Sequence, residues 1–153
     1  MAKQYYFSFV RPKLFTIAIL LFISSGFASA AERFAVTGKL VNIRSGPGTN
    51  YDILWQAEKY YPIDVIKKSG KWYKFKDFEG DIGWVYKSLV RKISAVITIK
   101  DKCNIRSGPG RKYNVLLISE KGVPFKVIKR EGSWINVQHS DGHEGWLHKS
   151  LVW

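Results

Sequence analysis

The chain has 153 residues, of which 46% are hydrophobic and 24% charged, and its formal net charge is +13. This length accommodates one ordinary domain or two very small ones. The single cysteine, Cys103, excludes an internal disulfide as a source of stability.

The first thirty residues have the pattern of a secretory leader. Three basic and no acidic residues precede or flank an apolar run at 14–23, and small residues follow, ending in the A-x-A sequence at 28–30. We predict a signal peptide over residues 1–30 that is cleaved between Ala30 and Ala31. The alternative, an uncleaved anchor, is disfavoured because a membrane span needs roughly 20 apolar residues.

Removal of the leader would leave 25 − 3 = 22 basic residues against 12 acidic ones, a charge of +10. In the cytosol this balance would suggest nucleic acid. Outside the inner membrane the abundant anions are cell-wall carboxylates and anionic lipid surfaces. We therefore expect a periplasmic or secreted protein with no nucleic-acid partner and no stable membrane span once the leader is removed.

The rest of the chain is a duplication. The sequence NIRSGPG occurs at 42–48 and again at 104–110, and the same offset of 62 residues aligns 24 identical pairs between 34–90 and 96–152. We expect one small domain over residues 31–91 and a second over residues 92–153. Because the connector contains no Gly or Pro, the two units should be held close together.

Each copy shows signals for short strands. Residues 63–66 and 125–128 are rich in β-branched and aromatic side chains, which predicts strands. Residues 72–76 and 134–138 alternate, which predicts strands with one buried face. Tyr73, Phe75, Ile135 and Val137 should point inward. Turns are expected at 77–80 and 140–142, and each Gly-Pro-Gly should break a strand through positive φ and the missing proline donor. Five or so strands in about 60 residues hide their edges by curling into a small barrel.

These motifs resemble the bacterial SH3-like family. Its members carry N-[IV]-R-S-G-P on the first strand, G-x-W entering a central strand and G-W-V near the end, and both copies show all three in order. The resemblance implies an all-β fold of two tandem SH3-like barrels. It also implies a non-catalytic binding role in the envelope, with cell-wall peptide or an envelope protein as the partner. Leu89 and Leu151 stand about where eukaryotic SH3 domains have a groove tyrosine, which disfavours proline-rich ligands.

Candidate ligand-binding residues recur at equivalent positions of the copies. Trp72 and Trp134 are out of phase with the inward residues, so they offer rigid contact area for a groove, or they pack under a loop or against the other repeat. An arginine before each Gly-Pro turn matches a carboxylate or fixes the turn. The candidates are Arg44, Tyr51, Trp72 and Tyr86 in the first copy, and Arg106, Tyr113, Trp134 and His148 in the second. Trp84 and Trp146 are expected in the core.

No pattern in the sequence predicts catalysis, a cofactor or a metal site. Cys103 aligns with Val41 and is expected to be a small core hydrophobe, and the three histidines all fall in the second copy. The leading hypothesis is an exported, non-enzymatic module that binds peptidoglycan peptide. The alternatives are an adaptor between envelope proteins without wall affinity and a degenerate hydrolase that uses Cys103.

Overall fold

The computed structural model describes residues 32–153. The predicted signal peptide and its cleavage between Ala30 and Ala31 lie outside this range. Over 32–153, no helix has both the length and the apolar character needed to cross a bilayer.

The first unit is a curled, antiparallel seven-stranded sheet with the order β3-β2-β6-β5-β4-β1-β7. A single 3₁₀ turn, η1 (Lys87–Leu89), leads from β6 into β7. The strands are β1 (Glu32–Val36), β2 (Leu40–Arg44), β3 (Ile53–Glu58), β4 (Pro62–Ser69), β5 (Trp72–Lys76), β6 (Ile82–Tyr86) and β7 (Val90–Arg91).

The second unit repeats this arrangement in six strands, ordered β10-β9-β13-β12-β11-β8. It consists of β8 (Ala95–Ile97), β9 (Cys103–Arg106), β10 (Val115–Ser119), β11 (Pro124–Glu131), β12 (Trp134–Gln138), β13 (Glu144–His148) and the 3₁₀ turn η2 (Lys149–Leu151). The residues described here thus form two small sheets with only single helical turns, which confirms the all-β prediction of two tandem SH3-like barrels.

Each unit buries one alternating face of its strands in a core of its own. Tyr73 and Phe75 are 6% and 0% exposed in the first unit, and Ile135 and Val137 are 2% and 1% exposed in the second, as the alternation predicted. Complete burial of a side chain of this size stabilises a fold by about 1.5–3 kcal/mol. The cores are separate clusters, so each copy supplies its own hydrophobic stabilisation.

Equivalent irregularities curl the longest strand of each sheet. The pairing of β4 with β5 shifts register between Val65 and Lys67, and that of β11 with β12 shifts between Val127 and Lys129. A bulge of this kind bends a strand and increases its twist, which lets an eight-residue strand contribute to both sides of a small barrel. The predicted turns also form, with Gly80 and Gly142 at φ 94° and 98°.

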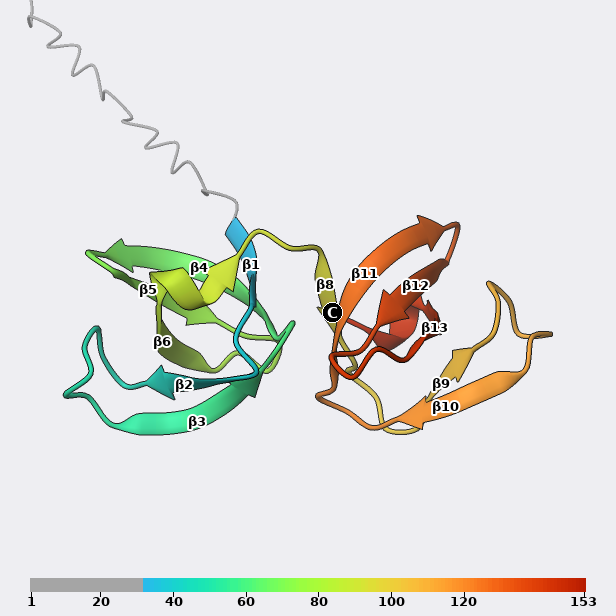
Figure 1. The fold of residues 1–153 in the computed structure, drawn as a ribbon, viewed down its shortest axis with the longest axis horizontal. Helices are drawn as coiled ribbons and strands as arrows, with labels where there is room; N and C mark the ends of the chain where they lie inside the picture. Colours follow the sequence, from blue (N-terminus) through green and yellow to red (C-terminus); the bar gives the residue numbers. More distant parts are fainter. Residues whose placement is uncertain (1–31) are drawn as a thin grey trace, which may run out of the picture.

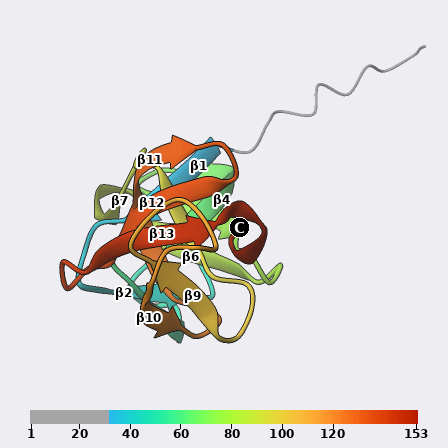
Figure 2. The same ribbon diagram turned by 90° about the vertical axis from the view of Figure 1, so that its right-hand side faces the viewer.

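The two units lie side by side and contact each other, with the C-terminus between them (Figure 1). Viewed along the long axis, the second unit lies in front of the first (Figure 2). The Arg33 guanidinium, held by two hydrogen bonds to Asp64, stacks 3.6 Å from the Trp153 ring centroid. Lys121 of the second unit forms an ion pair with Glu79 of the first at 2.6 Å.

Candidate functional site

The arginine of each NIRSGPG motif fixes the loop that follows it. Arg44 Nη1 donates to the carbonyl oxygens of Thr49 and Tyr51 at 3.0 and 2.7 Å. In the second copy Arg106 Nη1 donates to those of Arg111 and Tyr113 at 3.1 and 2.9 Å. Among the described residues, neither guanidinium makes an ion pair, so part of each remains available to a ligand.

The tyrosine after each motif packs against the turn. A side chain at Gly46 would occupy the space of the Tyr51 ring, and one at Gly108 would occupy that of Tyr113. The expectation that these glycines supply positive φ is wrong, because neither has a left-handed backbone. Each instead permits the close approach of a tyrosine ring. Tyr51 and Tyr113 support the loop and do not line the groove beside Trp72 or its equivalent beside Trp134.

In the first unit, three of the candidate residues line one groove on the outer face of β2, β5 and β6. Trp72 and Tyr86 are cross-strand partners whose rings meet edge to face, with centroids 5.3 Å apart. Arg44 lies on β2 beside them, and the groove has a volume of about 510 Å³. Its other lining residues are Gly38, Leu40, Val41, Asn42, Thr49 and Leu89.

The second unit has a groove at the equivalent place. Trp134 and His148 are cross-strand partners with ring centroids 5.3 Å apart, and Arg106 lies beside them. This groove is smaller, about 210 Å³, and its further lining residues are Lys102, Asn104, Arg111, Ser150 and Leu151. His148 Nδ1 lies 2.7 Å from the Ser150 hydroxyl and 3.3 Å from the Ser150 backbone nitrogen, so the ring is held against η2.

Comparison of the grooves at the 62-residue offset shows that their charge has diverged. Leu40 and Thr49 of the first groove are replaced by Lys102 and Arg111 in the second. The second groove therefore has two more cations around the same Trp and Arg. Its chemistry favours an anionic ligand, whereas the first groove offers a larger and more apolar surface.

Both units match the family model described as the bacterial SH3 domain, over residues 37–92 and 100–153. The chain belongs to the bacterial SH3 domain family. This match agrees with the resemblance drawn from the duplicated motifs and assigns the two grooves to two bacterial SH3 domains.

The bacterial SH3 domains of this chain are similar to segments of longer proteins. The chain is 29% identical to the putative N-acetylmuramoyl-L-alanine amidase YrvJ of Bacillus subtilis, over 96% of this chain and 30% of that protein. It is 46% identical to the probable cell wall amidase LytH of Staphylococcus epidermidis, over 33% of this chain and 18% of that protein. The chain thus spans less than a third of the length of these relatives.

Among solved structures, an NlpC/P60 family protein from Bacillus cereus is similar to this chain, with a TM-score of 0.37 and 14% sequence identity. The match covers 79% of this chain and 55% of that one.

The remaining sequence-derived candidates take structural positions in the bacterial SH3 domains. Cys103 is fully buried, its thiol donates to the Lys100 carbonyl oxygen at 2.9 Å, and burial raises the pKa of the thiol. Trp146 is 7% exposed, as expected. Trp84 is only half-buried, contrary to expectation, because Gly83 and Val85 take the inward positions of β6.

Two histidines and an aspartate meet at the hairpin of the second unit. His139 and His143 each place Nδ1 3.0 Å from Asp141 Oδ1. The hydrogen bond from the backbone N–H of His143, together with the His139 side chain, lowers the pKa of Asp141. Within residues 32–153, no group of three or more His, Cys, Asp or Glu side chains has an arrangement suited to a metal ion.

Sequence reasoning identified the aromatic and arginine walls of the grooves but missed the residues that distinguish them. Leu40, Thr49, Lys102 and Arg111 do not stand out as a motif. Thr49 and Arg111 lie in the loops after β2 and β9, and only the folded loops bring them to the grooves. The alignment of the two copies could have identified these positions. They differ in charge between the copies, whereas the NIRSGPG motif that lies between them is identical.

Proposed function

We propose that this protein is an exported, non-catalytic module that binds the peptide part of peptidoglycan through its two equivalent grooves. The observation that carries the proposal is the recurrence of one constellation, a tryptophan and an arginine beside a further ring, at the same place in both units. The similarity to a putative N-acetylmuramoyl-L-alanine amidase and to a probable cell wall amidase supports this class of ligand.

The groove chemistry suits a short peptide with a terminal carboxylate. The half-buried Trp72 and Trp134 offer rigid apolar area to the peptide backbone and methyl groups. The guanidinium nitrogens that do not hold the loop are donors for a carboxylate. The basic surface of the mature chain attracts the anionic wall at low ionic strength.

Among the described residues, the side chains give no support to a hydrolase that uses Cys103. The thiol is fully buried, and its pKa is raised rather than lowered, whereas a nucleophilic cysteine needs an accessible thiolate and a nearby base. The buried thiol supports the proposed binding role over the hydrolase alternative. The proposed location in the cell envelope depends on the predicted leader over residues 1–30.

Sedimentation with purified sacculi tests the proposal. The mature protein should pellet with the sacculi, and Trp72→Ala combined with Trp134→Ala should weaken binding more than tenfold, because each removes a central aromatic contact. Trp84→Ala is the matched control, since Trp84 is a half-buried tryptophan that lines neither groove. Unmodified protein that stays in the supernatant at low salt would refute wall binding.

A second candidate function, an adaptor between envelope proteins, is favoured by the edge strand β10. Four consecutive apolar residues of this strand, which lies at one end of its sheet, are between 38% and 64% exposed. They are Val115, Leu116, Leu117 and Ile118. An exposed apolar edge strand is a template for pairing with another chain.

Crosslinking followed by affinity capture separates the two functions. An adaptor would recover one specific envelope protein in the absence of sacculus binding, and Ile118→Lys would abolish that recovery. Wall binding through the grooves predicts that Ile118→Lys leaves co-sedimentation with sacculi unchanged.

A further inference from the structure

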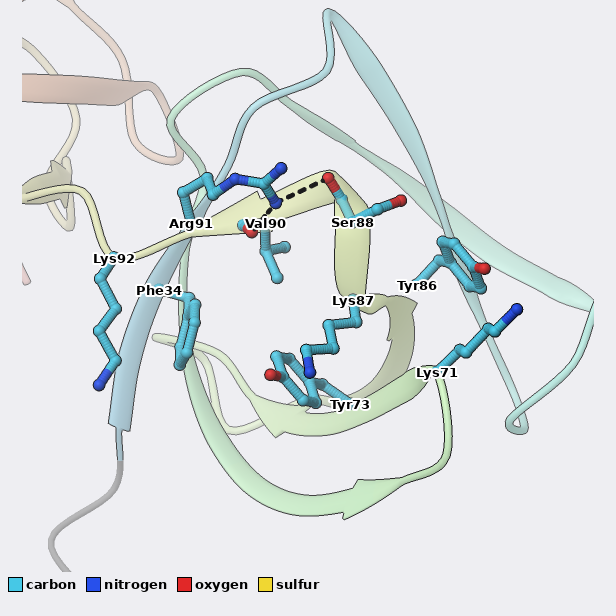
Figure 3. A pocket seen from close by; sticks show the side chains of 9 residues that line it. All are labelled: Phe34, Lys71, Tyr73, Tyr86, Lys87, Ser88, Val90, Arg91 and Lys92. Carbon is cyan, nitrogen blue, oxygen red and sulfur yellow. Dashed lines mark hydrogen bonds between the residues drawn. The ribbon is translucent and has the colours of Figure 1, made fainter.

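The first unit has a second pocket at the end of the sheet where β1, β5 and β7 come together. The residues that form its floor do not line the groove. Its volume is about 460 Å³, which is within the range of small-molecule sites. Phe34, Tyr73 and Val90 point into the hollow (Figure 3). They are 8%, 6% and 2% exposed, so the floor is an accessible edge of the hydrophobic core. Tyr86 lines both this pocket and the groove.

Four basic residues, which come from three segments of the chain, line the rim of this apolar floor. Lys71 lies in the β4–β5 turn, Lys87 in η1, Arg91 in β7, and Lys92 directly after β7. Lys87 reaches over Tyr73, with Nζ 6.0 Å from the ring centroid, and Lys92 stands 5.7 Å from that of Phe34. Arg91 Nη1 is held by the carbonyl oxygens of Ser88 and Val90.

The positive charge of this rim is largely uncompensated. Glu32 forms ion pairs with Lys92 at 3.1 Å and with Lys68 at 2.7 Å. Over residues 32–153, Lys71, Lys87 and Arg91 have no carboxylate within ion-pair distance. No acidic residue lines the pocket. Like charges gathered around an apolar floor repel one another, and an anionic ligand relieves that repulsion.

The second unit does not repeat this chemistry. At the 62-residue offset, Lys71 becomes Ser133, Tyr73 becomes Ile135 and Arg91 becomes Trp153. Of Lys71, Lys87 and Arg91, only Lys87 has a basic counterpart, Lys149. The pocket is therefore a feature of the first unit, not a by-product of the duplicated fold.

We propose that this pocket binds a phosphate ester whose alcohol part is apolar or aromatic. A ring of separate cations matches a multiply charged, three-dimensional anion better than a single planar carboxylate, and lysine binds phosphate as a point charge. The apolar floor covers the organic part of the ester. A soluble phosphate ester and the headgroup region of an anionic phospholipid share this chemistry.

Titration of the mature protein with phenyl phosphate, followed by amide NMR shifts, tests the proposal independently of wall binding. We expect saturable shifts at Phe34, Tyr73 and Lys87. Benzoate and phenol, which lack the phosphate, should bind at least several-fold more weakly. Lys87→Gln should weaken phenyl phosphate binding about fivefold, the effect of losing one partly exposed ion pair. Lys149→Gln, the matched change in the second unit, should leave it unchanged.

Vesicles identify the source of the ligand. Co-sedimentation with vesicles containing phosphatidylglycerol, but not with pure phosphatidylcholine, and its loss in Lys87→Gln would indicate a lipid. Phenyl phosphate binding without vesicle binding would indicate a soluble ester. The proposal is overturned if phenyl phosphate causes no shifts at the pocket, if benzoate binds equally well, or if Lys149→Gln is as harmful as Lys87→Gln.

Discussion

Exchange of the charged residues between the two grooves should exchange their preference for a carboxylate. Lys102→Leu with Arg111→Thr gives the second groove the side chains of the first at these two positions, and Leu40→Lys with Thr49→Arg makes the reverse change. All four positions are partly or fully exposed, so the changes leave the cores intact. The pair of cations is the only charge difference between the lining residues of the two grooves apart from the His148 ring.

The magnitude follows from the number and exposure of these cations. An exposed ion pair contributes about 0.2–1 kcal/mol, so two additional cations should favour an anionic ligand by about 1 kcal/mol. That difference corresponds to a ratio of about five in affinity. Because the groups are exposed, the ratio should shrink as salt is added and the Debye length falls to a few ångströms.

Calorimetry or NMR titration with a stem peptide and with its C-terminal amide measures the preference. The ratio of acid to amide affinity should be about fivefold larger in the second groove than in the first, because both keep an arginine and only the second has the two additional cations. The Lys102→Leu, Arg111→Thr protein should lower the ratio of the second groove to that of the first. The Leu40→Lys, Thr49→Arg protein should raise the ratio of the first groove by the same factor. Resonances near Trp72 and Trp134 report on the two grooves separately. Equal affinity for acid and amide in both grooves would refute the reasoning.

Three further predictions concern stability and the arrangement of the units. Tyr60 has φ 73°, a left-handed backbone that costs a non-glycine residue about 1–2 kcal/mol. Tyr60→Gly should therefore raise the free energy of unfolding by about 0.5–1 kcal/mol in urea melts. A free energy of unfolding below that of the unmodified protein would show that the contacts of the Tyr60 ring outweigh the strain. The Lys68 hydrogen bond lowers the pKa of Glu32, and the His143 N–H lowers that of Asp141, so unfolding takes up protons. Their stabilising effect is thus present above about pH 4.5 and lost as the pH falls further, and urea melts of the Glu32→Gln protein should show a weaker acid dependence. Trp153→Ala removes the stacking on Arg33, and ¹⁵N relaxation should then show the two units tumbling more independently, whereas unchanged correlation times would mean that other contacts suffice.

The fold could be predicted from the sequence because it depends on two patterns that the sequence shows directly. One is the local alternation of apolar and polar residues, and the other is the repetition of the same motifs 62 residues apart. Period-two alternation placed Phe75 and Val137 inside, and the duplicated Trp and Arg positions indicated the two grooves. The role of Tyr51 depends on a ring lying over a glycine across a loop, which spacing alone does not specify.

The pocket of the first unit was not predictable for a similar reason. Phe34, Lys71 and Lys92 are far apart in the sequence and belong to no motif, and only closure of the sheet brings them to one end. Trp84 is half-buried because Gly83 points into the core, and in a strand the next side chain then points outward. The sequence alone does not say which of the two faces inward.

The contact between the two units has a consequence for avidity. Two sites on a flexible tether can engage partners over a wide range of separations, whereas sites on docked units favour ligands whose spacing matches theirs. Because Arg33 and Lys121 bridge the units, binding at one groove would raise the effective concentration of a correctly spaced second site at the other. A periodic polymer would then be held more tightly than its isolated repeating element.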